Sequence, residues 1–225
     1  MRIYNCFETL KLTNKKALIT FLTAGDPNYD LSLELIKSLP EAGADIIEIG
    51  MPFSDPMADG PAIQASSLRA INSGHKMEKT FEMIESFRKD NSHTPIILMG
   101  YFNLIFQNGE NNFLKNCKSS GVDGLIIVDL PYPENKSFAN KCKKKSINFI
   151  QLLSPTTSKE RMKKIIKDSH DMVYYISMLS TTGGKLKVSP KKILENYNFI
   201  KRINPKKNYV IGFGITDKTI SYLKS

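Results

Sequence analysis

The sequence predicts an α/β fold, specifically a (β/α)8 or TIM barrel, and three observations support this prediction. Short apolar runs alternate with segments whose apolar residues recur at helical spacing. Strands that alternate with helices in this way form parallel sheets with helices packed outside them. The first run leads into TAGDP, not into the glycine-rich fingerprint of a dinucleotide-binding open sheet. Residues suited to a functional site follow nearly every run. Functional groups at the C-terminal ends of many strands favour a barrel over a doubly wound open sheet.

Seven apolar runs are predicted as strands: 17–23, 45–50, 95–99, 124–129, 147–153, 172–177 and 208–212. Helical spacing lies between them, in the sets Leu31, Leu33, Leu35 and Ile36; Phe81, Ile84 and Phe87; and Met162, Ile165 and Ile166. No linker, low-complexity tract or repeat interrupts the series, so residues 1–225 are expected to form a single domain. A complete barrel has eight strands. The domain is therefore expected to be C-terminally incomplete, with about seven of the eight strands present.

Composition argues against several classes of protein. No run approaches ~20 apolar residues, so no membrane span is expected, and the N-terminus lacks the apolar core of a secretory signal. The net charge of +10 comes almost entirely from lysine. No arginine-and-aromatic motif appears, so nucleic acid is not an expected partner. Cys6, Cys117 and Cys142 are odd in number and far apart, which is typical of free thiols in the cytoplasm.

The segment EIGMPFSDPMADGP, residues 48–61, has an unusual composition for a connecting loop. It carries three carboxylates, Glu48, Asp55 and Asp59. It also carries the prolines Pro52 and Pro56, which stiffen the backbone, and it closes with Gly60-Pro61. A plain connection is usually a few residues long. The composition therefore predicts a stiffened loop that holds a ligand or a partner.

Glu48 lies inside an apolar strand, DIIEIG, where a glutamate is unexpected. A period of two places Ile46 and Glu48 on one face, and both faces of a barrel strand are buried. Burial raises the pKa of a carboxyl toward neutrality, which suits a general acid–base. The alternative is that Glu48 pairs with a buried lysine or caps a loop amide.

Asp59 and Asp55 each have a simpler interpretation beside the functional one. Pro61 suits the first turn of the helix AIQASSLRAI, so Asp59 could be only a turn residue. Asp55 before Pro56 is an ordinary turn dipeptide. Their positions also allow a functional interpretation: Glu48 at the end of a strand and Asp59 in the following loop can both face one barrel mouth.

Two later glycine-rich loops are candidate anion sites. TTGG (181–184) follows the sixth predicted strand, and GFGIT (212–216) leads into a predicted helix. Glycines and helix N-terminal amides favour phosphate, although glycines also serve plain turns. The histidines, His75, His93 and His170, lie in polar connections and form no metal-binding pattern. No metal site is predicted.

Several motifs in order resemble one known family: FLTAGDP, EIGMPFSDPMADGPAIQ, YFNLIF, GVDGLIIVDLP, YYISMLSTTGG and GFGI. Over about residues 17 to 220 the chain is similar to the α subunit of tryptophan synthase, and the 48–61 segment is highly specific. The resemblance implies a (β/α)8 barrel lyase that, with its C-terminus completed, cleaves indole-3-glycerol phosphate to indole and glyceraldehyde 3-phosphate. It also implies an α2β2 heterotetramer with a β subunit that carries pyridoxal phosphate, and no cofactor in this chain.

The resemblance also implies roles for individual residues. Glu48 matches the general acid–base and Asp59 the second catalytic carboxylate. The remaining matches are Phe21, Phe213, Tyr174 and Tyr101 for substrate binding, Gly183, Gly212 and Gly214 for phosphate, and Pro52, Asp55 and Pro56 for the loop facing the β subunit. Core packing is the alternative for Phe21 and Phe213.

The chain departs from the family pattern at three places. Ser180 stands where glycine is usual, and Met178 where arginine is often found. The family's Gly-Ser phosphate donors after an eighth strand are not in the 225 residues. A second hypothesis is therefore a catalytically inactive, truncated subunit that binds and activates the β subunit. A different phosphate-binding barrel enzyme is a more distant third.

Overall fold

The computed structural model describes residues 1–176 and 190–212. It divides the chain into two compact units, which are described separately below. The first unit comprises residues 1–56 and 64–149, and the second comprises residues 57–63 and 150–225. The expected single domain stays a prediction. The predicted site residues Met178, Ser180, Gly183, Phe213 and Gly214 lie outside the described residues.

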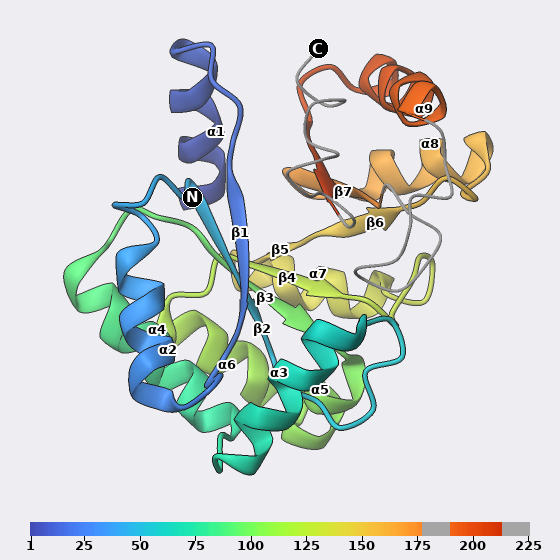
Figure 1. The fold of residues 1–225 in the computed structure, drawn as a ribbon. Coiled ribbons are helices and arrows are strands. Elements are labelled where there is room, and N and C mark those ends of the chain that lie inside the picture. The colour runs from blue at the N-terminus through green and yellow to red at the C-terminus, as the bar shows by residue number, and fades with distance from the viewer. Residues whose placement is uncertain (177–189, 213–225) are drawn as a thin grey trace. The chain divides into compact units, whose positions relative to one another are not determined.

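The first unit contains a five-stranded parallel sheet with strand order β1-β2-β3-β4-β5 (Figure 1). Its elements are α1 (Arg2–Leu12), β1 (Ile19–Thr23), α2 (Tyr29–Ser38), β2 (Ile46–Gly50), α3 (Pro61–Asn72, from Gln64 onward), α4 (Met77–Asp90), β3 (Ile96–Gly100), α5 (Phe102–Asn108), α6 (Glu110–Ser120), β4 (Gly124–Ile127), α7 (Lys136–Lys144) and β5 (Asn148–Phe149). Strands alternate with helices, as the sequence predicts. The predicted α/β class is therefore confirmed in this unit.

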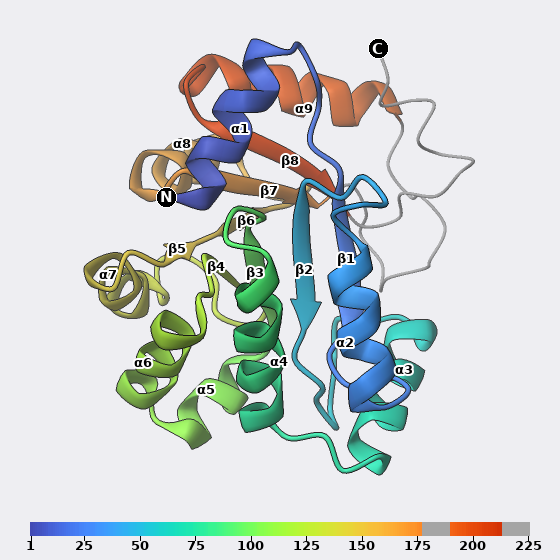
Figure 2. The ribbon, with the colours of Figure 1, turned by 90° about the vertical axis from the view of Figure 1, so that its left-hand side faces the viewer.

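The core of the first unit lies between one face of this sheet and the helices α2, α4, α6 and α7, which pack beside one another in sequence order (Figure 2). Ile47 and Ile49 of β2 and Ile96 and Leu98 of β3 all point into this core, and all are fully buried. Each such side chain contributes roughly 1.5–3 kcal/mol by leaving water. The period of two therefore turns Ile46, Glu48 and Ile97 to the opposite face.

Helix α1 was not predicted from the sequence. It buries Ile3, Phe7 and Leu10, which recur at helical spacing and form one apolar face. Polar contacts also attach it to the connections that precede β3 and β4. Arg2 Nε donates to the Ser92 carbonyl at 2.6 Å, and Arg2 Nη1 donates to Asp123 Oδ1 at 3.0 Å.

Asp123 joins α1 to α4 at the start of β4. Its Oδ2 accepts from Arg88 Nη2 at 2.8 Å and from the Ile96 amide at 2.9 Å. Arg88 also donates to the carbonyls of Gly121, Asn91 and Thr94. Burial lowers the pKa of Arg88 to about 10, although the charge of Asp123 opposes that change.

Replacing Asp123 with asparagine is expected to lower the free energy of unfolding by about 2 kcal/mol, because the buried Arg88 loses a charged acceptor. The matched control is Asp90→Asn, which breaks an exposed pair with Lys37 at 2.7 Å. Such surface pairs contribute less than ~1 kcal/mol. Urea unfolding of both variants measures the difference. Equal losses would show that the Asp123 cluster stabilises the protein no more than a surface pair.

The second unit contains a three-stranded parallel sheet with order β6-β7-β8. Its described elements are β6 (Gln151–Leu153), α8 (Lys159–Asp168), β7 (Met172–Ile176), α9 (Pro190–Ile203) and β8 (Asn208–Gly212). Tyr175 of β7 is fully buried, and its hydroxyl accepts from Asn196 of α9 at 2.8 Å. The predicted strand 147–153 is interrupted at Ile150, so β5 and β6 belong to different sheets.

Within the described ranges, no helix is both long and apolar enough for a membrane crossing. The three cysteines are free, and Cys117 and Cys142 are buried.

Candidate functional site

Glu48 occupies the centre of β2, and all five residues of this strand are buried. Its side chain lies on the sheet face opposite the core formed by Ile47 and Ile49, and it is only 4 % exposed. Parallel pairing aligns Glu48 with Phe21 of β1 and with Ile97 of β3. The carboxyl therefore lies between two apolar neighbours on one face of the sheet.

Burial dominates the electrostatics of Glu48. Desolvation raises the pKa of its carboxyl from an ordinary value of 4.5 to about 7. Across the residues with described positions, no hydrogen bond or ion pair holds this carboxyl. The alternative of a Glu48 paired with lysine or capping an amide therefore finds no support in the described structure. A carboxyl that titrates near pH 7 can both give and take a proton at neutral pH.

Phe21 borders Glu48 on β1. A Cβ atom placed on Gly50 would lie 2.6 Å from Phe21 Cζ, so the absence of a side chain at Gly50 lets the ring lie over β2. Gly50 is two residues beyond Glu48 and lies on the same face of the strand. The Phe21 side chain is 38 % exposed. The alternative of ordinary core packing does not fit this exposure, and Phe21 instead offers an open apolar surface beside Glu48.

Thr23 continues the same face of β1 toward its end. Thr23 Oγ1 and Ser66 Oγ of α3 form a buried hydrogen bond of 2.6 Å. This bond joins β1 to the helix that follows the 51–60 loop. Sequence reasoning missed it, because serine and threonine in a strand and a helix carry no pairing signal.

Tyr101 lies directly after β3 and is 2 % exposed. Its ring stacks on Phe53, with the ring centroids 5.2 Å apart and the planes at 30°. The base of the 51–60 loop is thus fixed by an aromatic contact. Asp55 is exposed at its tip and accepts a hydrogen bond from the Ser54 hydroxyl.

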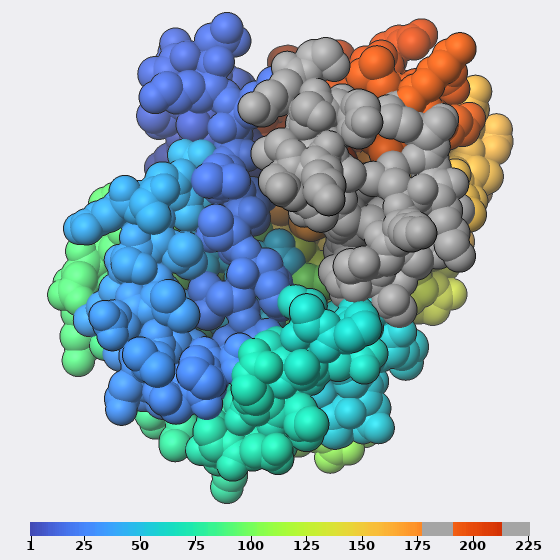
Figure 3. All heavy atoms as spheres, viewed as in Figure 1, coloured from blue at the N-terminus to red at the C-terminus, as the bar shows by residue number. Residues whose placement is uncertain are grey.

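The predicted loop residues Pro52 and Pro56 flank this tip and are half-buried, and Met57 beyond them is 75 % exposed. Figure 3 shows α3, the next element, at the surface in teal. An exposed tip on a base fixed by stacking is suited to contact a partner.

His75 packs against the loop that follows β1. The sequence did not predict this role for His75. The ring lies against Gly25, which has a φ of +77° and follows β1, and a Cβ at Gly25 would overlap it. His75 Nε2 shares a hydrogen bond of 2.8 Å with the Thr80 hydroxyl. Desolvation lowers the pKa of His75 to about 4, so the ring is neutral at pH 7. Within the described ranges, no cluster of three His, Cys, Asp or Glu side chains could hold a metal.

Two other predicted residues lie together in the second unit. Tyr174 of β7 is 8 % exposed, and Gly212 ends the neighbouring strand β8. Pairing aligns Tyr174 with Val210, so Gly212 follows two residues later on the same face. A Cβ at Gly212 would overlap the Tyr174 hydroxyl. This arrangement repeats that of Phe21 over Gly50 in the first unit.

Asp59 belongs to the segment 57–63 of the second unit and is 9 % exposed. α3 begins at Pro61, two residues later, as the turn interpretation predicted. Glu48 belongs to the first unit. Each carboxylate is therefore described within its own unit, and their joint placement stays a prediction.

A family model and a curated relative both point to the same protein family. Residues 7–221 match the family model described as tryptophan synthase alpha chain. A curated tryptophan synthase alpha chain from Pelagibacter ubique (strain HTCC1062) is 61 % identical over 218 residues, which are 97 % of this chain and 82 % of the relative.

Solved structures agree with this match. Tryptophan synthase subunit alpha from Legionella pneumophila has a TM-score of 0.87 at 37 % identity, covering 98 % of this chain and 80 % of that one. A chain of the tryptophan synthase a2b2 complex from Pyrococcus furiosus has a TM-score of 0.82 at 39 % identity, covering 92 % and 83 %. These neighbours are TIM barrels, which confirms the predicted fold class. The chain belongs to the tryptophan synthase alpha chain family.

Proposed function

We propose that this chain is a lyase that cleaves indole-3-glycerol phosphate to indole and glyceraldehyde 3-phosphate, as the α subunit of tryptophan synthase. Family membership supports the reaction class. The observation that carries the proposal is Glu48, a carboxyl buried in an apolar strand with a pKa raised to about 7. A general acid–base is most effective when its pKa lies near the working pH.

In the proposed mechanism Glu48 first donates a proton to C3 of the indole ring. Protonation there makes the ring a leaving group and places positive charge on the ring nitrogen. The carboxylate of Asp59 would stabilise this charge by accepting the N–H hydrogen bond. Glu48, now ionised, would then take the proton of the glycerol hydroxyl next to the ring. The carbon–carbon bond breaks as that hydroxyl becomes the aldehyde, and indole leaves.

Substrate binding is proposed to divide between apolar and phosphate contacts. Phe21 offers its exposed ring beside Glu48 and would pack against the indole. Tyr174 and Phe213 match substrate-binding positions of the family and are proposed to contact the substrate, and Tyr101 would support the site by holding Phe53. Gly183, Gly212 and Gly214 are proposed to bind the phosphate through backbone amides.

The proposed partner is a β subunit, in an α2β2 assembly. A solved neighbour is described as the tryptophan synthase a2b2 complex. The exposed tip of the 51–60 loop, at Asp55, is the proposed contact. Pyridoxal phosphate would belong to the β subunit, and this chain would need no cofactor. Free, partly buried thiols fit the proposed cytoplasmic location.

The test is an assay of indole release from indole-3-glycerol phosphate by the purified 225-residue chain, alone and with a β subunit. Cleavage that increases when the β subunit is added would support the proposal. Activation of the β subunit without any cleavage would instead support the inactive-subunit hypothesis.

Gly50→Ala is expected to weaken indole binding about tenfold, because the new methyl group displaces the Phe21 ring. Phe21→Ala should weaken binding to a similar degree. The double variant should bind no more weakly than Phe21→Ala alone, since the methyl group then has no ring to displace. Calorimetric titration with indole measures all three. Additive losses would contradict the role given to Phe21.

Binding of a β subunit is expected to slow amide hydrogen exchange in residues 51–60, since the exposed tip becomes covered. Exchange detected by mass spectrometry, in a complex verified by its mass, measures this protection. Residues 159–168 of α8 serve as an internal reference. Unchanged exchange in residues 51–60 would exclude this loop as the contact.

A further inference from the structure

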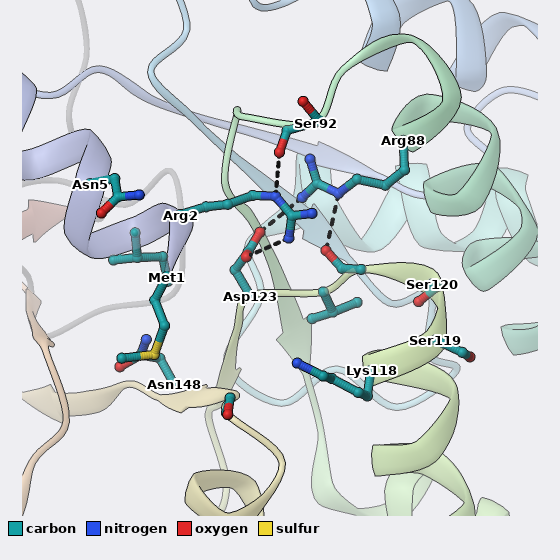
Figure 4. Close-up of a pocket in the computed structure, with 14 residues that line it drawn as sticks. Met1, Arg2, Asn5, Arg88, Ser92, Lys118, Ser119, Ser120, Asp123 and Asn148 are labelled. Atoms are coloured by element: carbon teal, nitrogen blue, oxygen red, sulfur yellow. Dashed lines mark hydrogen bonds and ion pairs between the residues drawn. The ribbon is translucent and has the colours of Figure 1, made fainter.

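A cavity of about 490 Å³ lies where α1 meets the starts of β4 and β5 (Figure 4). Its walls come from α1, from the end of α4 and from the connection between α6 and β4. The candidate catalytic residues Glu48 and Phe21 do not line it. Cavities of about 300–1,000 Å³ commonly hold small ligands.

The lining of this cavity carries an excess of positive charge. Among the lining side chains, Arg2, Arg88 and Lys118 are cations and Asp123 is the one carboxylate. Both oxygens of Asp123 are already engaged, by Arg2, by Arg88 and by the Ile96 amide. The remaining charge favours an anionic ligand.

Arg2 and Lys118 retain most of their hydrogen-bond donors for a ligand. Arg88 uses four of its five N–H donors on three carbonyls and on Asp123, so it serves mainly to shape the cavity. Arg2 uses Nε and one N–H of Nη1, which leaves the other N–H of Nη1 and both of Nη2. Lys118 is exposed, and within the described ranges it forms no ion pair or hydrogen bond.

Arg2 enters the cavity from α1, while Lys118 extends its ammonium group into it from α6 (Figure 4). The neighbouring Ser119 and Ser120 hydroxyls donate to the Asn116 carbonyl and are not available as donors to a ligand. A ligand that uses both cations must therefore offer acceptors in two directions. A carboxylate presents two oxygens in one plane, whereas a phosphate presents three around a tetrahedral centre.

We propose that this cavity binds the phosphate group of a small phosphate monoester through Arg2 and Lys118. The bound group would bridge α1 to α6 and so strengthen the attachment of the N-terminal helix. This site is separate from the proposed catalytic residues, so the inference does not depend on the proposed lyase activity.

The test uses inorganic phosphate as the probe and the full chain with any tag at its C-terminus, because Arg2 lines the cavity. Amide resonances of residues 118–123 are followed by ¹H–¹⁵N NMR during titration with sodium phosphate. Parallel titrations use sodium succinate and sodium chloride at matched ionic strength. Lys118→Met is compared with Lys115→Met, a control on the exposed surface of the same helix that does not line the cavity.

Saturable shifts of these resonances with phosphate, and not with chloride, are expected. Lys118→Met should raise the Kd read at these amides at least ~10-fold, because a charge-assisted hydrogen bond is lost. Lys115→Met should leave it unchanged. The inference is overturned if shifts are absent or linear, if succinate binds equally well, or if Lys118→Met binds phosphate as the unaltered chain does. Reading the signal at residues 118–123 separates this outcome from phosphate binding at the glycine loops.

Discussion

Replacing Glu48 with glutamine is expected to lower kcat for indole-3-glycerol phosphate cleavage by at least ~10²-fold, with a smaller change in KM. The amide keeps the shape of the side chain but can neither give nor take the proton, and general acid–base catalysis contributes ~10²–10⁴-fold. Steady-state assays in the presence of the β subunit measure the loss.

The matched control for this substitution is Glu41→Gln, which makes the same chemical change at an exposed position before β2. Its turnover should be close to that of the unaltered chain. Circular dichroism of both variants checks that each one folds. A Glu48→Gln variant that retains normal turnover would remove Glu48 from the mechanism.

The same substitution is expected to stabilise the protein at alkaline pH. The Glu48 carboxyl has a folded-state pKa of about 7, above its ordinary value of 4.5. As pH rises from about 4.5 to about 7, the unfolded chain loses this proton before the folded chain does, so the folded state becomes relatively less stable. The full cost at pH 8 is about 3 kcal/mol. Below pH 4.5 both states hold the proton, and the cost vanishes.

Glu48→Gln removes this cost because its amide does not ionise. Urea unfolding at pH 8 should show the variant to be more stable than the unaltered chain by up to about 3 kcal/mol. The advantage should shrink as the pH is lowered toward 4.5. Glu41→Gln, the same chemical change at an exposed position, is measured beside it as the matched control. A difference between Glu48→Gln and the unaltered chain that stays constant from pH 5 to pH 8 would contradict burial as the cause of the raised pKa.

The strands were predictable because apolar, β-branched runs are a strong local signal. The observed β1, β2, β3 and β8 begin and end within two residues of the predicted runs. The buried face of each helix was predicted less reliably than the strands. In the apolar sets at helical spacing, Phe81, Ile84 and Phe87 of α4 are all buried, whereas Leu31 and Leu35 of α2 are about half exposed. Spacing alone did not show which α2 residues would meet the sheet.

The contacts that attach α1 were not predictable, because their partners are far apart in sequence. Arg2 and Arg88 meet on Asp123, although 86 positions separate the two arginines. A signal for this cluster was nonetheless present. In a chain whose positive charge is nearly all lysine, the rare arginines suggest sites that need several fixed donors. Arg69 fits the same rule, since it binds both oxygens of Asp26 at 2.7 Å.

The candidate site was predictable in part. Glu48 stood out because a glutamate interrupted an apolar strand, and its burial followed from the strand period. The Phe21 ring over Gly50 and the Tyr101 ring on Phe53 depend on neighbouring strands and loops, which spacing does not encode. Sequence resemblance supplied roles for these residues, and the structure adds the contacts that hold them.

The most direct test of the account is the titration of the Glu48 carboxyl itself. Chains labelled with ¹³C at glutamate carboxyls are followed by NMR from pH 4 to pH 9, and Glu48→Gln identifies the resonance by its loss. The account predicts a midpoint near pH 7, well above the ordinary value of 4.5. A midpoint near 4.5 would mean that Glu48 is not tuned for acid–base chemistry at neutral pH, and would contradict the proposed mechanism.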